Sequence, residues 1–302
     1  MILKVIIFLL VFHQKRYIKA KKVSYLCWHE LCIYKLVSKI TLGKGNDFMN
    51  IPSFRLDGKV ALVTGGSKGL GYGMAIALGK YGAKVAIASR GQEDLDRAVK
   101  EMQEMDIEVK GFTVDVTKKE LVEKLVEDVV KEYGRIDILV NNAGMNIRKP
   151  LVEIEEEDWD RVTGTNLKGV FLVGQAVAKQ MKKQKYGKII NISSILGTIG
   201  MPFQTSYAAS KGGVNQMTKI WANELAEYGI TVNAIGPGYI KTPMTEGWLS
   251  DPERYIKIVE RTLQKRVGEL EDLVGPVVFF ASDTSAHVTG QILNVDGGWT
   301  AH

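Results

Sequence analysis

Short apolar runs alternate with longer amphipathic segments along the chain from Lys59 onward. Runs that stay apolar throughout are typical of strands buried on both faces of a parallel sheet, and the amphipathic segments between them predict helices that cover both faces. The sequence therefore predicts an α/β fold, a single doubly wound Rossmann-type domain with a seven-stranded parallel sheet. The expected strands span residues 60–64, 84–89, 109–114, 136–141, 188–193, 230–235 and 291–295.

Two of the expected helices carry signals at their ends. Thr117 is followed three residues later by Glu120, the spacing of a capping box, and apolar residues then recur at helical spacing until Gly134 ends the helix. Acidic residues cluster at positions 153–158, where they would complement the dipole of a second helix start. We interpret this cluster as a solvated helix end and predict no metal site.

Composition and charge favour one large globular domain. The chain has 302 residues, 45% of them hydrophobic and 25% charged, and a formal net charge of +6. Residues 1–48 hold nine Lys or Arg against two acidic residues, whereas the remainder holds 31 basic against 32 acidic residues, so nucleic-acid binding is not expected. Both cysteines, Cys27 and Cys32, also lie within residues 1–48. The body therefore has no disulfide framework, which suits a cytoplasmic protein.

The leader, residues 1–48, starts with an apolar run to Phe12 that is shorter than the roughly 18 to 20 residues needed to span a bilayer. No small-residue cleavage site follows it, so it is a poor secretory signal. A membrane-surface anchor is the alternative, although no sustained helical stripe supports one. A purine-rich stretch resembling a ribosome-binding site can encode residues 43–45, just upstream of Met49. We expect translation to begin at Met49, with 1–48 a non-native or disordered leader, 49–302 the functional domain and no membrane partner.

A glycine cluster follows the first expected strand and opens a helix, which is the setting in which a Gly-rich turn binds phosphate. Gly65 would permit the tight turn, Gly69 would let a pyrophosphate approach the backbone, and Gly71 would allow close helix packing. The alternative is a plain strand-to-helix turn, since the spacing differs from the conventional dinucleotide fingerprint. The same turn supplies three further cofactor-binding candidates: Ser67, Lys68 and Leu70.

The second expected strand ends at Ser89 and Arg90, where an acidic residue would hold the adenine ribose 2′-hydroxyl. No carboxylate stands there. Arg90 and Lys68 would instead hold a 2′-phosphate, so NADP(H) is favoured as cofactor and NAD(H) stays an alternative. Both cations could equally be ordinary surface residues at helix ends.

Tyr207 and Lys211 lie four residues apart, thirteen residues after Ser194. On a helix, positions i and i+4 share a face, so the phenol and the ammonium can point into one cleft. A nearby positive charge favours the ionised form of a phenol, and we therefore expect Lys211 to lower the pKa of Tyr207. A tyrosine tuned in this way serves as a general acid and base near neutral pH.

These motifs occur in the order and at the spacing of one enzyme family, and the match covers residues 54–299. The chain resembles the short-chain dehydrogenase/reductase family on Thr64-Gly65-x-x-x-Gly69-x-Gly71, Asn141-Asn142-Ala143-Gly144, Asn166, Ser194, Tyr207-x-x-x-Lys211 and Pro237-Gly238. The resemblance implies an NAD(P)-dependent oxidoreductase, commonly a homotetramer, that acts on a small carbonyl or alcohol.

The resemblance also implies roles for single residues. Tyr207 would exchange a proton with the substrate oxygen, Lys211 would lower its pKa and bond the nicotinamide ribose, and Ser194 would hydrogen-bond the substrate oxygen. Asn166 would support a proton relay through water. The remaining cofactor contacts would be Asp115, Val116, Asn142, Ala143, Gly144, Pro237, Gly238, Ile240 and Thr242. Asp115 is alternatively a turn former, and the segment at about 243–266 resembles a mobile substrate lid.

Substrate choice depends on Arg148, which follows Asn142-Ala143-Gly144 closely enough to hold a substrate carboxylate beside the catalytic cleft. With the chain end, Arg148 resembles the gluconate 5-dehydrogenase branch, although Ile147 stands where many of that branch carry another arginine. We expect a keto sugar acid such as 5-dehydro-D-gluconate and its hydroxy form as the substrate pair. Arg148 is alternatively a surface residue or a subunit contact.

Three other functions remain open. A 3-oxoacyl-[acyl-carrier-protein] reductase would share every catalytic residue, and a 2-deoxy-D-gluconate 3-dehydrogenase-like activity would share the sugar-acid site. A scaffold that senses NADP without turnover is the non-enzyme alternative, but it would have no physical need for Ser194, Tyr207 and Lys211 together.

Overall fold

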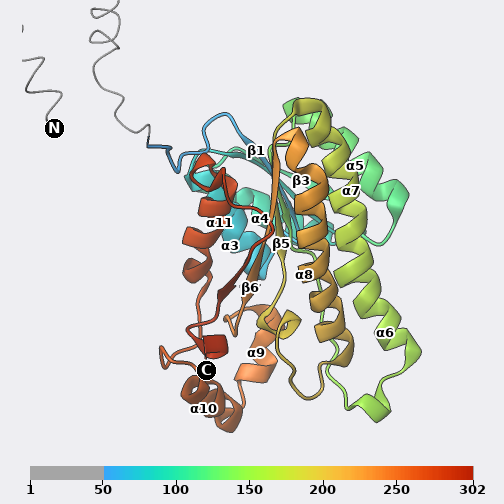
Figure 1. Cartoon of the computed structure of the whole chain (residues 1–302), viewed down its shortest axis with the longest axis vertical. Coiled ribbons are helices and arrows are strands. Elements are labelled where there is room, and N and C mark those ends of the chain that lie inside the picture. The colour runs from blue at the N-terminus through green and yellow to red at the C-terminus, as the bar shows by residue number, and fades with distance from the viewer. Residues whose placement is uncertain (1–50, 302) are drawn as a thin grey trace, which may run out of the picture. The chain divides into compact units, whose positions relative to one another are not determined.

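Seven strands form one sheet in the order β3-β2-β1-β4-β5-β6-β7, and every neighbouring pair is parallel. This confirms the predicted doubly wound α/β fold, seen with the sheet at the centre of Figure 1. The strands are β1 (Val60–Thr64), β2 (Lys84–Ser89), β3 (Val109–Thr113), β4 (Ile138–Asn141), β5 (Gly187–Ile192), β6 (Ile230–Pro237) and β7 (Ile292–Val295).

This computed structural model describes residues 51–301, and residues 52–301 belong to one compact unit. The predicted leader at 1–48 and the predicted start at Met49 lie outside the described residues. None of the helices within 51–301 is both long enough and apolar enough to cross a membrane.

Helices cover the two faces of the sheet, as Figure 1 shows. One face carries α3 (Gly69–Lys80), α4 (Gln92–Glu104) and α11 (Val274–Ala281), and the other carries α5 (Lys119–Tyr133), α7 (Val170–Gln184) and α8 (Thr205–Leu225). Successive residues of β1 point to opposite faces. Ala61 and Val63 pack with the α3 layer, whereas Val60 and Leu62 pack with the α5 layer. This double burial explains why β1 is apolar throughout.

Strand β4 begins at Ile138, two residues later than predicted. The backbone of Ile136 bonds the Gln184 side chain instead of a neighbouring strand, with an N to Oε1 distance of 3.1 Å and an Nε2 to O distance of 2.8 Å. A side chain from α7 therefore replaces the strand ladder at Ile136, and the apolar run of the strand begins only after Asp137.

The predicted capping box at Thr117 is wrong. Lys118 is the N-cap of α5 and makes no side-chain capping bond, while the Thr117 hydroxyl donates to Asp115 Oδ1 at 2.8 Å. The Thr117 side chain therefore belongs to the turn that precedes α5. The helix ends as predicted, because Gly134 adopts a left-handed φ of 81°.

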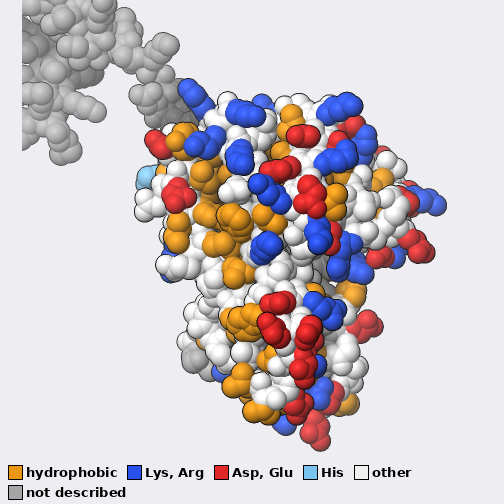
Figure 2. Space-filling view, turned by 90° about the vertical axis from the view of Figure 1, so that its right-hand side faces the viewer, with side chains coloured by type: hydrophobic (Ala, Val, Ile, Leu, Met, Phe, Trp, Pro, Cys, Tyr) orange, Lys and Arg blue, Asp and Glu red, His pale blue; other side chains and the backbone are white. Residues whose placement is uncertain are grey.

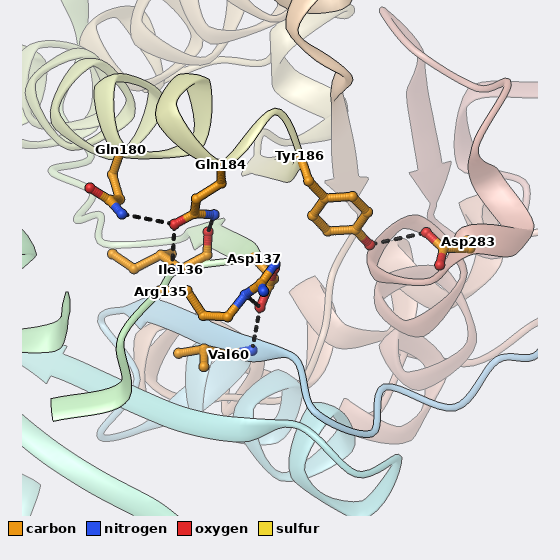
Figure 3. A network of polar contacts seen from close by, with 8 residues as sticks. All are labelled: Val60, Arg135, Ile136, Asp137, Gln180, Gln184, Tyr186 and Asp283. Carbon is orange, nitrogen blue, oxygen red and sulfur yellow. Dashed lines mark hydrogen bonds and ion pairs between the residues drawn. The ribbon is translucent and has the colours of Figure 1, made fainter.

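A polar network joins the amino ends of β1 and β4, at the opposite edge of the sheet from the strand carboxyl ends (Figure 3). Asp137 is fully buried and accepts from the Val60 backbone N at 3.0 Å and from Arg135 Nε at 2.8 Å. Beside it the Tyr186 hydroxyl donates to Asp283 at 3.0 Å. These bonds satisfy polar groups that the sheet itself leaves unpaired at its edge.

Helix α6 (Glu156–Thr163) runs through a π-helical turn, Gly164–Gly169, into α7. Its first turn holds Glu156, Glu157 and Asp158, which confirms the predicted acidic helix start. Figure 2 shows the side of the molecule on which Figure 1 places α6. Acidic side chains gather in the lower part of that view. Two further helices, α9 (Pro243–Leu249) and α10 (Pro252–Arg261), occupy most of the predicted lid segment.

Candidate active site

A cleft of about 460 Å³ opens at the carboxyl ends of the strands. It lies where β1 pairs with β2 on one side and β4 on the other, the point at which the strand order reverses and α/β proteins bind their ligands. Its lining includes every predicted cofactor-binding residue except Asp115: Gly65, Ser67, Lys68, Gly69, Leu70, Ser89, Arg90, Val116, Asn142, Ala143, Gly144, Tyr207, Lys211, Pro237, Gly238, Ile240 and Thr242.

The turn after β1 leaves no room for side chains at two of its glycines. Gly65 has φ +62°, and a Cβ there would lie 2.9 Å from Asn142 Nδ2. A Cβ on Gly71 would lie 2.2 Å from the Gly65 carbonyl oxygen. Only glycine permits this close approach, so the start of α3 presents its backbone amides to the cleft.

Asn142 and Thr64 lock the β1 turn to the segment after β4. Asn142 Nδ2 donates to the Thr64 carbonyl at 2.9 Å, and the backbone N atoms of Asn142 and Ala143 donate to Thr64 Oγ1 at 3.0 and 3.1 Å. These bonds therefore fix the Asn142-Ala143-Gly144 segment against the end of β1, where both line the cleft. Thr64 was identified at sequence level as part of a motif, and its hydroxyl supplies this bond.

Tyr207, Lys211 and Ser194 line the other end of the cleft. Both Tyr207 and Lys211 lie on α8, and the Lys211 Nζ atom is 5.6 Å from the centre of the Tyr207 ring. Lys211 is 3% exposed and donates to the Ile192 carbonyl at 2.7 Å. Ser194 follows β5 and accepts from the Leu196 backbone N at 3.1 Å. The structure thus brings together three of the four predicted catalytic side chains.

The electrostatics of Tyr207 differ from the expectation. Burial raises the pKa of the phenol, and the influences that lower it come from the Ser194 hydroxyl and the Arg148 charge. Lys211 is not among these influences, and burial lowers the pKa of Lys211 itself to about 8. The expectation did not include burial, which shifts the pKa values of both groups.

Asn166 lies behind the cleft and does not line it. Its side chain is fully buried in the π-helical turn, where Oδ1 accepts from Met145 N and Nδ2 donates to Met145 O, each at 2.8 Å. Both polar atoms bond Met145 in the cleft wall, and Nδ2 also donates to Ser210 Oγ at 3.3 Å. Asn166 therefore positions the segment around Gly144 and Met145, and a π turn at such a point is typical of functional sites.

Asp115 is placed by the structure outside the cleft lining. Its Oδ1 accepts from the backbone N of Thr117 at 2.9 Å, which is the turn-forming role that was the alternative at sequence level. Its neighbour Val116 does line the cleft.

The adenosine end of the cleft holds a carboxylate that was not predicted. Asp94, in the first turn of α4, lines the cleft beside Lys68, Ser89 and Arg90. Its Oδ2 atom lies 3.2 Å from Lys68 Nζ, and the buried Ser89 Oγ atom has no hydrogen-bond partner within residues 51–301. Sequence reasoning examined only the end of the second strand and missed Asp94 five residues farther on, in what looked like an ordinary helix start.

Arg148 lies beside Tyr207 and against α9. Its Cζ atom is 4.9 Å from the centre of the Trp248 ring on α9, and the Cζ of Arg254 on α10 is 4.2 Å from the same ring. The Nε atom of Arg148 is buried without a hydrogen-bond partner in the described part of the chain. Burial lowers the pKa of this guanidinium, while Tyr239 and Tyr207 raise it. Neither Trp248 as a cation-π partner nor Arg254 was predicted.

Comparisons with known proteins agree with this arrangement. Residues 59–253 match the family model described as short chain dehydrogenase. The chain is 46% identical over 244 residues to a 3-oxoacyl-[acyl-carrier-protein] reductase of Thermotoga maritima, covering 81% of this chain and 98% of that one. It is 41% identical over 247 residues to a gluconate 5-dehydrogenase of Gluconobacter oxydans, covering 82% and 96%. A gluconate 5-dehydrogenase of Burkholderia cenocepacia, solved in complex with NADP and tartrate, superimposes with a TM-score of 0.81 at 37% identity, covering 83% and 99%.

Proposed function

The chain belongs to the short-chain dehydrogenase family, and from that premise we propose an NADP(H)-dependent oxidoreductase that interconverts a keto sugar acid and its hydroxy form. The family makes the protein an NAD(P)-dependent dehydrogenase or reductase. The finer proposal, a substrate of the 5-dehydro-D-gluconate type, rests above all on Arg148. Its Nε atom is buried beside Tyr207 and has no hydrogen-bond partner within residues 51–301.

The residues present fit a nicotinamide dinucleotide. The glycine turn excludes side chains at Gly65 and Gly71, and the buried Ser89 hydroxyl at the adenosine end has no partner among the residues that the structure describes. A bound dinucleotide supplies or accepts the hydride. Its pyrophosphate would be held by the amides at the start of α3, and its nicotinamide end by the loop at Pro237 and Gly238.

The catalytic side chains would act on the carbonyl oxygen. Tyr207 donates a proton to that oxygen as it gains negative charge, and the Ser194 hydroxyl hydrogen-bonds the same oxygen. Lys211 keeps a donor toward the cofactor ribose and holds the pocket in place through its bond to Ile192. Asn166 fixes the cleft wall through Met145, so that the substrate meets a preorganised site.

A carboxylate-bearing substrate would satisfy the guanidinium of Arg148. A partly buried cation costs free energy unless an anion pairs with it, and Arg148 has only the faces of Trp248 and its tyrosine neighbours. Arg254 stacks on the same ring from the lid and adds a second positive charge. The similar Burkholderia enzyme was solved with tartrate, a dicarboxylate, which supports an anionic ligand in this class of site.

NADP(H) is proposed as the preferred cofactor because Ser89, Arg90 and Lys68 surround the adenosine end and the second strand ends without a carboxylate. A 2′-phosphate would find two cations and a hydroxyl donor there. The similar Burkholderia structure contains NADP, which points the same way.

A 3-oxoacyl-[acyl-carrier-protein] reductase is the second candidate, because a relative of that name shares 46% identity over almost its whole length. A 2-deoxy-D-gluconate 3-dehydrogenase-like activity would use the same anionic site as the first proposal. An NADP-sensing scaffold without turnover is disfavoured by the close placement of Ser194, Tyr207 and Lys211 in one cleft.

A homotetramer is proposed with the same function. Two helices of one face, α7 and α8, expose large apolar side chains, with Phe171 at 40% and Ile220 at 48% exposure. Apolar surface of this kind is typical of subunit contacts. A cytoplasmic location is proposed as well, since the body contains no cysteine.

Replacing Arg148 by alanine tests the sugar-acid proposal. We expect KM for 5-keto-D-gluconate to rise roughly tenfold or more, because one ion pair to the carboxylate is lost, while KM for a neutral ketone changes less than about twofold. Arg148→Lys should recover part of the loss, since it restores the charge and not the planar fork.

Arg161→Ala is the matched control, because Arg161 is exposed on α6, whereas Arg148 is partly buried beside Tyr207. It should leave both KM values unchanged. Equal effects of Arg148→Ala on the sugar acid and on the neutral ketone would overturn the assignment of Arg148 to a substrate carboxylate.

A further inference from the structure

The cleft contains one anionic side chain at the end where Arg90 and Lys68 would meet a 2′-phosphate. Asp94 projects from the first turn of α4 into the lining, and 34% of its side chain is exposed. Its two oxygens are divided between two cations, with Oδ2 3.2 Å from Lys68 Nζ and Oδ1 3.0 Å from Arg97 Nη2. The cation assigned to the phosphate is therefore already bonded to a carboxylate.

Asp94 keeps its negative charge at neutral pH. The hydrogen bond from Lys68 is the main cause that lowers the pKa of Asp94, and Arg97 adds to the effect. Arg90 is exposed nearby, and Glu93 is the neighbouring acid on the same helical turn. The adenosine end thus presents a mixture of charges, not a purely cationic pocket.

Any phosphate that Lys68 binds must approach this carboxylate. A phosphate oxygen that accepts a hydrogen bond of about 2.8 Å from Nζ lies at most about 6 Å from Asp94 Oδ2, because Nζ and Oδ2 are 3.2 Å apart. Two anions at that range repel each other, and the phosphate must also compete with Asp94 for the ammonium. A neutral ribose 2′-hydroxyl meets neither obstacle and can donate to a carboxylate.

We propose that Asp94 sets the cofactor discrimination of this enzyme by opposing the 2′-phosphate of NADP(H) while leaving NAD(H) binding intact. Asp94 holds Lys68 in place when no phosphate is bound and weakens NADP(H) binding relative to what Arg90 and Lys68 alone would give. This inference rests on the dinucleotide binding of the proposed function and is independent of its substrate.

The simpler interpretation makes Asp94 an ordinary acid that complements the dipole of α4. Glu93 and Asp96 share the same region of the helix, yet of the three only Asp94 lines the cleft and pairs with Lys68. A dipole role would change the stability of α4 and would affect NADPH and NADH equally. Cofactor discrimination separates the two interpretations.

The test is direct titration of NADPH and of NADH, followed by nucleotide fluorescence without any substrate, for the wild type, Asp94→Asn and Asp96→Asn. Asp94→Asn should lower the Kd for NADPH about tenfold, the effect of one like charge removed at about 6 Å in a half-exposed site, and change the Kd for NADH less than twofold. The gain should shrink in high salt. Asp96 bonds Gln92 on the same helix at 2.7 Å, so Asp96→Asn should change neither Kd.

Competition with adenosine 2′-monophosphate and adenosine 5′-monophosphate isolates the ribose end, and only the former should bind more tightly to Asp94→Asn. The proposal is overturned if Asp94→Asn leaves the Kd for NADPH unchanged, or if it lowers the Kd values for NADPH and NADH equally. A wild type that prefers NADH, combined with tighter NADPH binding by Asp94→Asn, would overturn the proposed NADP(H) preference and support the role of Asp94.

Discussion

Lys211 carries an amine into a pocket that is nearly closed to water, with 3% of the residue exposed. Its only direct hydrogen bond within residues 51–301 goes to the neutral Ile192 carbonyl, which cannot offset the loss of hydration of an ammonium ion. Burial therefore lowers the pKa of Lys211 to about 8, well below its ordinary value of 10.5. Keeping the amine charged in this pocket costs free energy, and the cost disappears when the amine is neutral.

This pKa predicts a dependence of stability on pH. Between pH 8 and pH 10.5 the unfolded chain holds the proton on Lys211 and the folded chain does not, so the free energy of unfolding gains a term that rises with pH. The wild type should gain about 3 kcal/mol relative to Lys211→Met across this window. Urea unfolding of both proteins at pH 8, 9 and 10 measures the difference. Two curves that stay parallel would contradict the burial of a charged amine.

At the scale of residues, the sequence predicted most of the residues that line the cleft, but it predicted little of their electrostatics. The spacing of Tyr207 and Lys211 required only helical periodicity, so their shared cleft could be foreseen. The effect of burial on their pKa values, the pairing of Lys68 with Asp94 and the stacking of Arg148 on Trp248 depend on segments far apart in the sequence. No spacing rule predicts such contacts.

Elements meet through side chains as well as through the strand ladder. At the amino ends of β1 and β4, the Asp137 carboxylate is fully buried and accepts from the Val60 backbone and from Arg135 (Figure 3). The same region delays the start of β4, because Gln184 takes both backbone groups of Ile136. These bonds fix the amino ends of strands whose carboxyl ends form the cleft.

Removing Asp137 should therefore be costly. We expect Asp137→Ala to lower the free energy of unfolding by about 3 kcal/mol, since it leaves a buried backbone N–H and a half-exposed guanidinium without their partner. Asp128→Ala is the control, because Asp128 pairs with Lys124 on the exposed face of α5 at 2.9 Å and should contribute less than about 0.5 kcal/mol. Equal losses in urea unfolding would contradict the structural role of the network.

The sequence predicted which elements exist and missed some of their boundaries and contacts. All seven strands were predicted. For the central strands the reason is burial on both faces, which leaves a largely apolar run, whereas the edge strands β3 and β7 are only partly buried. The capping box at Thr117 was predicted wrongly because the Thr117 side chain bonds the turn carboxylate of Asp115, and Lys118 is the N-cap. For the segment 243–266, its role as a mobile lid stays a prediction, while its two helices and its contact with Arg148 are structural facts.

At the scale of the whole molecule, the exposed apolar side chains of α7 and α8 favour assembly. We expect light scattering to give about four times the mass of one chain, and Phe171→Asp combined with Ile220→Asp to reduce it. Leu121→Asp places the same change on α5, at a residue 42% exposed, and should leave the mass unchanged. A monomer in the wild type would contradict the tetramer.

The doubly wound sheet brings the cleft, Tyr207 and the guanidinium of Arg148 to the same end of its strands, and their combination predicts a keto sugar acid as substrate. Steady-state oxidation of NADPH by the wild type tests this most directly, with 5-keto-D-gluconate, the neutral keto sugar L-sorbose and a 3-oxoacyl thioester as alternative substrates. Tyr207→Phe measures the background. The account predicts that kcat/KM for the keto acid exceeds that for each of the others by roughly tenfold or more. A higher kcat/KM for the thioester would contradict it.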